Sequence, residues 1–133
     1  MVFVLLETTL LFLYCPPAKL YALFNPVPHM RILFFYKSIG VFINTLDRSA
    51  ATKVLRTINL LERFGSQLKM PHSKKIDRDL FELRIRGQQE IRLLYTFYKD
   101  GAILLHGFIK KTEKMPLREL LTARHKLTLL DVT

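Results

Sequence analysis

Two arginines are the first residues that could do chemistry. Arg84 lies in LFELRIR (80–86) and Arg92 in EIRLLYTFY (90–98), and both segments have the composition of β-strands. Successive side chains of a strand point to opposite faces, and burying an unpaired arginine in a small core would be costly. We therefore expect Arg84 and Arg92 on one solvent-exposed face of a sheet, where guanidinium groups can bind phosphate in a bidentate manner.

The next residues of interest lie on AILLHGFIK (102–110), which runs into two adjacent lysines. His106 and Lys110 share a parity in this segment, and Lys111 follows at its exit. A lysine pair at a strand end is most often only a solvated terminus. Beside the two arginines, however, the lysines would extend a basic surface, and histidine is the residue type that titrates near neutral pH.

Such a basic surface has the features of an RNA-binding site. Lys74 and Lys75, in the polar segment 66–77, would approach it from a loop, and Arg86 continues the parity of the first arginine. The ring of Tyr98 or of Tyr95 is available for stacking on a base. The sequence therefore predicts RNA-binding roles for Lys74, Lys75, Arg86 and Tyr98.

Each of these assignments has a structural alternative. Arg84 and Arg92 can form ion pairs with Glu82 and Glu90, and would then stabilise the sheet without binding phosphate. His106 can be a structural histidine with a satisfied hydrogen bond. The sequence alone leaves these alternatives open.

The elements that must position these residues follow from hydrophobic periodicity. Asp47 or Ser49 can cap a helical stretch that Gly65 ends, Asp100 and Gly101 signal a hairpin, and Pro116 fits the first turn of an amphipathic helix. The predicted order is strand, one helix or helical hairpin, loop, three strands and helix, over residues 31–36, 41–65, 66–77, 80–86, 90–98, 102–110 and 115–130. This order predicts a small α+β domain in which the helices pack on one face of an antiparallel sheet and the other face stays free.

The composition fits one basic domain. At 133 residues, half of them apolar, the chain can bury a single core. Residues 1–29 hold one cation and one anion, so the whole formal charge of +10 lies in residues 30–133. Nucleic acid is the first polyanion that such a domain should attract, ahead of an anionic membrane or an acidic protein. One cysteine, Cys15, excludes an internal disulfide framework and fits a reducing, cytoplasmic compartment; the four histidines lack ligand spacing, so no metal or other cofactor is expected.

The first 29 residues differ from the rest. They are apolar, lack a basic start, contain Glu7 within the apolar run, and soon meet Pro16 and Pro17. This run is too short to span a bilayer comfortably and is a poor secretory signal. We expect Met30 to be the natural start, and residues 1–29 to be a translated upstream stretch or a dispensable extension. The alternative is an apolar arm that packs on the domain or on a partner chain.

The series of motifs in about residues 30–128 resembles a known family. PHSKKI, LFELRIRG, IRLLYTFY, ILLHGFIKKTEKMP and RELLTAR, in this order, look like the phage-derived branch of the RelE/HigB toxins of bacterial type II toxin–antitoxin systems. The ordered series is more specific than any one motif. The resemblance implies a small α+β endoribonuclease that cleaves mRNA, generally on the ribosome. It also implies a cognate antitoxin, often a helix-turn-helix repressor.

The resemblance further implies roles for the basic residues. Arg84 and Arg92 match positions on the central strands where family members carry basic residues, and Lys110 and Lys111 match the basic strand end. Some relatives have a tyrosine near the last helix that is thought to act in proton transfer, but MPLRELL (115–121) has none. The identity of the acid and base groups therefore stays open.

The expected chemistry needs no metal, because the 2′-hydroxyl of RNA can attack the adjacent phosphate. We assign Arg84 and Arg92 to a phosphate clamp, Lys110 and Lys111 to phosphate binding or proton relay, and His106 to acid–base catalysis. Other functions remain open: a non-catalytic RNA- or ribosome-binding protein, or an inactive prophage remnant. The expected partners are mRNA, the ribosome and the antitoxin, with no membrane, because the basic residues alternate on strands and do not line one helix face.

Overall fold

The computed structural model describes residues 29–132, which form a five-stranded sheet and three α-helices. The predictions for residues 1–28 lie outside the described residues. In chain order the elements are β1 (Arg31–Phe34), α3 (Lys37–Thr45), α4 (Arg48–Phe64), a short 3-10 helix η1 (Gly65–Gln67), β2 (Ser73–Asp77), β3 (Leu80–Ile85), β4 (Ile91–Tyr98), β5 (Gly101–Ile109) and α5 (Leu117–Val132). None of the helices in this part of the chain is long and apolar enough to cross a membrane.

The sheet has the strand order β1-β5-β4-β3-β2. Strands β3, β4 and β5 form the predicted antiparallel arrangement, and β2 pairs antiparallel with β3 at the edge. Strand β1 runs parallel to β5, with Arg31 opposite Gly101. The predicted α+β class is confirmed, but the sheet is mixed and not wholly antiparallel. Helices α3 and α4 carry the chain from β1 to the opposite edge of the sheet, and this long connection permits the parallel pairing.

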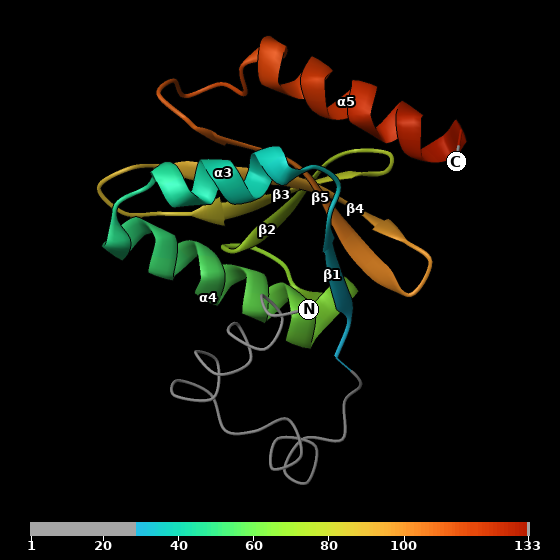
Figure 1. The fold of residues 1–133 in the computed structure, drawn as a ribbon, viewed down its shortest axis with the longest axis horizontal. Coiled ribbons are helices and arrows are strands. Elements are labelled where there is room, and N and C mark those ends of the chain that lie inside the picture. Colours follow the sequence, from blue (N-terminus) through green and yellow to red (C-terminus); the bar gives the residue numbers. More distant parts are fainter. Residues whose placement is uncertain (1–28, 133) are drawn as a thin grey trace, which may run out of the picture.

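Helices cover both faces of the sheet, so the prediction that one face stays free is wrong. Figure 1 shows α4 and α5 on opposite sides of the strands. We call these sides the α3–α4 face and the α5 face. The α3–α4 face contains the larger core cluster, which includes Ile39, Ile43, Val54, Ile58, Leu61, Leu83, Leu93 and Leu104. The α5 face contains a smaller one of Leu80, Leu94, Ile103, Leu105, Phe108, Ala123 and Leu130.

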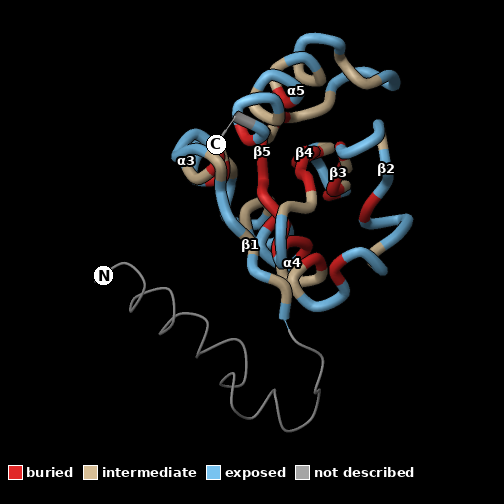
Figure 2. Tube along the Cα trace, turned by 90° about the vertical axis from the view of Figure 1, so that its right-hand side faces the viewer, coloured by how far each residue is buried: buried red, intermediate tan, exposed pale blue. Residues whose placement is uncertain are grey.

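Strands β3, β4 and β5 form the buried centre of the molecule (Figure 2). Helix α5 is apolar on more than its buried side: Ala123 and Leu130 are buried, whereas Leu117 and Leu121 are 66% and 52% exposed. The prediction of an amphipathic helix therefore does not account for these two leucines. Their spacing of four residues places them together on the outer side of the helix.

The helical hairpin has the predicted signals at its ends. Helix α3 ends before Leu46, whose backbone is extended. The Asp47 carboxylate then caps α4 by accepting a hydrogen bond from the Ala50 N–H at 2.7 Å. Gly65 ends α4 with a φ of 54°, a backbone conformation that favours glycine. Of the two predicted alternatives, the structure has the hairpin.

The expected loop over 66–77 contains strand β2, which is a correction. Its residues pair with β3 at the sheet edge, with Lys74 opposite Glu82 and Lys75 opposite Phe81. Lysines are common on edge strands because they discourage pairing with other chains, so a polar sequence there does not exclude a strand.

A β-bulge in β5 decides which way its side chains point. Leu94 pairs with His106 and Tyr95 pairs with Leu104, so Leu105 is the extra residue. Consequently Leu105 and His106 both lie on the α5 face, and the alternation resumes with Gly107 on the α3–α4 face. Bulges are frequent beside functional sites because they redirect a side chain in this way.

Gly107 allows α3 to pack closely on β5. A Cβ atom at this position would lie 2.7 Å from Phe42 Cδ1 and 2.8 Å from Leu93 Cδ2. Since both neighbours belong to the α3–α4 face, neither can move without disturbing the larger core.

We predict that Gly107→Ala lowers the free energy of unfolding by about 1–3 kcal/mol, the usual cost of overpacking a core. Urea denaturation measures the change. Gly40→Ala is the matched control, because a Cβ there has no neighbour within 4 Å and alanine favours a helix interior. Equal stability of the two variants would contradict the close packing of α3 on β5.

Tyr95 links β4 to the edge strand. Its hydroxyl shares a 2.6 Å hydrogen bond with the hydroxyl of Ser73, and both residues are buried. Burial raises the pKa of the Tyr95 phenol above its ordinary value of 10.0, although the hydrogen bond to Ser73 opposes the shift. The folded protein therefore holds this proton more tightly than the unfolded chain does.

We predict that Tyr95→Phe costs about 1 kcal/mol at neutral pH, the net value of one hydrogen bond. The stability linked to the Tyr95 proton is present below pH 10.0, the ordinary pKa, and is lost as pH rises through the higher pKa of the folded phenol. Urea denaturation at neutral and alkaline pH should show a smaller alkaline loss in Tyr95→Phe than in the wild type. An unchanged alkaline loss would contradict the buried phenol as its source.

Candidate functional site

The two predicted arginines meet on the α5 face. Arg84 of β3 lies directly opposite Arg92 of β4, and Glu82 lies two residues before Arg84 on the same face. Two like charges opposite each other on neighbouring strands would repel. The pair therefore needs anions close by.

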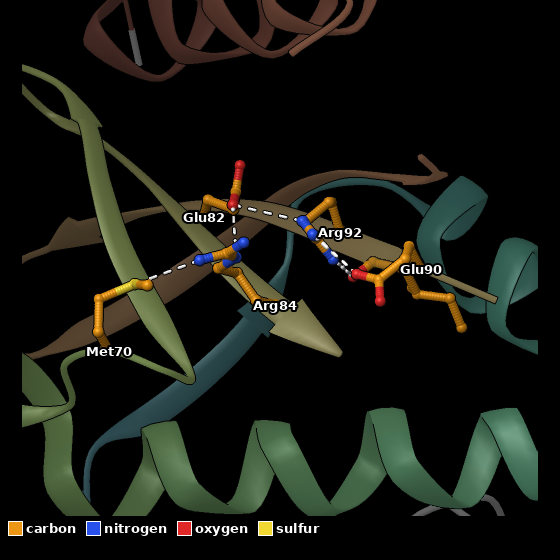
Figure 3. A network of polar contacts seen from close by, with 6 residues as sticks. Met70, Glu82, Arg84, Glu90 and Arg92 are labelled. Carbon is orange, nitrogen blue, oxygen red and sulfur yellow. Dashed lines mark hydrogen bonds and ion pairs between the residues drawn. The ribbon is translucent and has the colours of Figure 1, made fainter. Parts of the chain in front are cut away.

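Glu82 supplies the central anion. Its Oε1 atom lies 3.3 Å from the Nε atoms of both Arg84 and Arg92. Figure 3 shows the Glu82 carboxylate between the two guanidinium groups, with Glu90 on the far side of Arg92. Arg92 donates from NH2 to Glu90 Oε2 at 2.9 Å and from NH1 to the backbone oxygen of Ile91 at 3.0 Å.

The burial of these side chains corrects the expectation that both arginines are exposed. The Arg92 side chain is 3% exposed, Glu82 6%, Arg84 16% and Glu90 41%. The structure thus has the alternative arrangement, in which Arg84 and Arg92 pair with Glu82 and Glu90. The Nε–H groups of both arginines are buried and make no hydrogen bond within residues 29–132, so they contact Glu82 through charge alone.

The cluster of Glu82, Arg84, Glu90 and Arg92, which we call the Arg–Glu cluster, has two positive and two negative groups. Its formal charge is therefore zero. An incoming phosphate would find no net attraction at Arg92 unless a carboxylate moved away. The clamp roles of Arg84 and Arg92 stay predictions, but the two arginines are not equivalent: the Arg84 side chain is partly exposed, whereas that of Arg92 is buried.

His106 lies beside the Arg–Glu cluster. It is opposite Leu94, two residues along β4 from Arg92, and its ring stacks on Phe108 with centroids 5.9 Å apart. Its Nε2 atom forms a hydrogen bond with the Glu119 carboxylate of α5, and the two side chains are 20% and 26% exposed.

Sequence reasoning missed Glu119. Pro116 correctly indicated the start of a helix, and an acidic residue in a first turn is an ordinary feature of helices. Nothing in the local sequence, however, says which strand that turn will contact. The contact between Glu119 and His106 depends on which side of the sheet α5 covers.

The two lysines lie at the end of β5 nearest the Arg–Glu cluster. The Lys110 N–H donates to the Glu90 backbone oxygen at 2.6 Å, which extends the pairing of β4 and β5 by one residue. Lys110 is half-buried and Lys111 is exposed. Neither forms an ion pair within the described residues, so both ammonium groups are available to an anionic ligand.

The predicted RNA-binding residues are only partly brought together. Lys74 lies opposite Glu82 on the α5 face, and Arg86 is exposed just beyond β3. Lys75 belongs to the other face, with its Nζ atom 5.9 Å from the centre of the Phe81 ring. Tyr98 lies six residues from Arg92 along β4, about 20 Å away at the usual rise of a strand, so it does not join this site.

A small cavity lies elsewhere. It has a volume of about 180 Å³ and lies on the α3–α4 face between the start of α4 and the β3–β4 turn, with Asp47, Lys53, Gly87 and Gln89 in its wall. We place the candidate site on the α5 face because the charged and titratable side chains converge there. Within residues 29–132, no group of three or more His, Cys, Asp or Glu residues is placed to hold a metal ion.

We predict that Glu82→Gln lowers the free energy of unfolding by about 3–5 kcal/mol, because it leaves buried guanidinium charge without its central partner. Glu90→Gln is the matched control. Glu90 is far more exposed, and an exposed ion pair is worth at most about 1 kcal/mol. Chemical denaturation of both variants measures the difference. Similar costs for the two substitutions would show that Glu82 does not hold the cluster.

The comparison with protein families agrees with part of the predicted resemblance. The family model described as phage derived protein Gp49-like (DUF891) matches residues 41–128, which is more than half of the chain and includes α4, β2 to β5 and most of α5. No curated protein matches the sequence at a significant level. The match spans the Arg–Glu cluster, His106, Glu119 and both lysines. The chain therefore belongs to the Gp49-like family of phage-derived proteins.

Proposed function

We propose that the protein is the toxin of a type II toxin–antitoxin system and that it cleaves mRNA, on the ribosome and in the cytoplasm, without a metal ion. The resemblance of the motif series to RelE/HigB toxins and the membership of the Gp49-like family support this function. One geometric observation carries it: the partly exposed His106 shares a sheet face with Arg84 and lies on the strand that ends at Lys110 and Lys111.

The proposed reaction is an attack of the RNA 2′-hydroxyl on the adjacent phosphorus. The O2′–P bond forms, the P–O5′ bond breaks, and the products are a 2′,3′-cyclic phosphate and a 5′-hydroxyl. A base must take the 2′-hydroxyl proton, an acid must protonate the leaving oxygen, and cations must stabilise the charge on the phosphorane. His106 is the proposed base, since imidazole changes charge near neutral pH.

The lysines are better placed than Arg92 to contact the phosphate. Arg92 is buried and has both of its carboxylate partners, whereas Lys111 is exposed and Lys110 lies half-buried beside Glu90. Arg84 is the third proposed phosphate ligand because part of its side chain reaches the surface. The proposed role of Arg92 is to hold Glu82 and Arg84 in place.

The proposed partner in the cell is an antitoxin, and a helix-turn-helix protein is the kind that the resemblance implies. A charge of +10 also suits the two other proposed partners, mRNA and ribosomal RNA, because cationic proteins associate with polyanions quickly.

We predict that Lys110→Ala and Lys111→Ala each lower the rate of mRNA cleavage by about tenfold or more, because a hydrogen bond to a charged group is worth about 1.5–3 kcal/mol. The test is tightly controlled expression of the full chain in bacteria. Growth and the mapped 5′ ends of transcripts are followed together for the wild type, the two variants and the double variant.

Lys37→Ala is the matched control, because Lys37 is exposed at the start of α3, a helix on the sheet face opposite the proposed site, and has no assigned role. Arg92→Ala would be a poor probe, since it leaves the buried Glu82 carboxylate with one partner fewer. Healthy growth and intact transcripts with soluble, folded wild-type protein would contradict the proposal and favour a non-catalytic RNA-binding protein. Cleavage at the wild-type level by the double lysine variant would contradict the proposed role of Lys110 and Lys111 in binding the phosphate.

A further inference from the structure

Helix α5 is fixed to the sheet at the bulge that redirects His106. The Lys126 Nζ atom donates to the backbone oxygen of Leu105, the extra residue of the bulge, at 2.9 Å. Three residues earlier, within one turn of the helix, Ala123 is fully buried against the same strand. These contacts place the first turn of α5, which contains Glu119, beside the imidazole ring.

The Glu119 carboxylate is suited to accept a hydrogen bond. It lies in the first turn of α5, where the free N–H groups and the helix dipole favour a negative charge. An ionised carboxylate can only accept, so Nε2 of His106 must donate. The neutral ring then has its lone pair on Nδ1, and Nδ1 makes no hydrogen bond within the described residues.

We propose that Glu119 is a positioning residue that holds the neutral His106 ring in the Nε2–H tautomer and leaves Nδ1 free to take the 2′-hydroxyl proton. This inference rests on the proposed function. A carboxylate that binds one ring nitrogen sets which nitrogen carries the proton, as in catalytic triads and metal sites. The stacking on Phe108 restricts the remaining rotation of the ring.

The other charged groups around His106 leave Glu119 as its direct partner. Lys126 of α5 directs its ammonium group to the Leu105 oxygen and lies 5.4 Å from the centre of the Tyr36 ring. Burial lowers the pKa of Lys126. On the sheet side, Arg92 and Glu82 are paired with each other within the Arg–Glu cluster. Of the described acidic residues, Glu119 is the one that bonds to the imidazole.

The proton balance of the proposed step is complete. Nδ1 takes the proton of the 2′-hydroxyl as the O2′–P bond forms, and the ring becomes an imidazolium ion whose positive charge Glu119 stabilises. The P–O5′ bond breaks, and the leaving oxygen takes a proton from the Lys110 ammonium group or from water. No oxidant, reductant or further reactant is required.

The test compares Glu119→Ala with the wild-type full chain in two measurements. Imidazole nitrogen NMR, at a pH about two units above the ordinary histidine pKa of about 6.5, reports which nitrogen of His106 carries the proton. His106→Gln identifies the signals among the four histidines. Single-turnover cleavage of an mRNA bound to purified ribosomes gives the rate and the substrate concentration for half-maximal rate.

We expect the wild type to show the Nε2–H tautomer and Glu119→Ala to show a mixture. The maximal cleavage rate should fall about 10–100-fold, the usual cost of losing a carboxylate that orients a functional histidine. The mRNA concentration that gives half of the maximal rate should change little. Glu113→Ala is the matched control: Glu113 is exposed in the loop before α5 and forms no hydrogen bond or ion pair with His106. Glu119→Gln keeps the size of the side chain and replaces Glu119→Ala if the latter does not fold.

Three results would overturn the inference. One is an unchanged tautomer in Glu119→Ala. Another is cleavage at the wild-type rate by the folded variant, which would make Glu119 only an anchor for α5. The third is a wild-type protein that does not cleave at all; this would remove the proposed function itself, and the NMR signals would then report a purely structural pair.

Discussion

The buried carboxylate of Glu82 is the constraint on which the α5 face depends. Two arginines lie opposite each other on adjacent strands, and charge at such depth is tolerated only when it is paired. Glu82 satisfies this requirement at 3.3 Å from both Nε atoms, and Glu90 completes the balance at the surface. Because the resulting cluster has no net charge, it is a scaffold for the site more than a source of positive potential. In the proposed function, the attraction for RNA comes from the lysines around it.

The position of α5 gives the same face its second feature. A bulge turns both Leu105 and His106 toward the helix, and α5 responds with Ala123 against the apolar residues and Glu119 against the imidazole. Apolar packing and one polar contact thus fix the same helix in one place. The proposed base His106 and the Arg–Glu cluster consequently occupy one side of three strands, while the larger core fills the other side.

The predictions from sequence succeeded where a local pattern determines the structure. The alternation of apolar and polar residues predicted β3, β4 and β5, and the Asp100–Gly101 pair predicted the hairpin between β4 and β5. Asp47 and Gly65 predicted the ends of α4. The predictions failed where contacts between residues distant in the sequence determine the structure. Strand β2 was missed because it is a polar edge strand. The face of the sheet that α5 covers is set by contacts with Leu94, Ile103 and Leu105. The same limit applies to the site. Basic residues on one face were predictable, but the burial of Arg92 and the contact of Glu119 with His106 required the packed structure.

The most direct test of the central claim is the chemistry of the RNA ends. Purified full-length protein is mixed with an mRNA on purified ribosomes, and the ends of the products are identified for the wild type and His106→Gln. If the protein is a metal-independent endoribonuclease with His106 as its base, the wild type gives 2′,3′-cyclic phosphate and 5′-hydroxyl ends in the presence of a chelator tolerated by the ribosome, and the variant gives few. Uncut mRNA, or equal cleavage by the two proteins, would contradict that account.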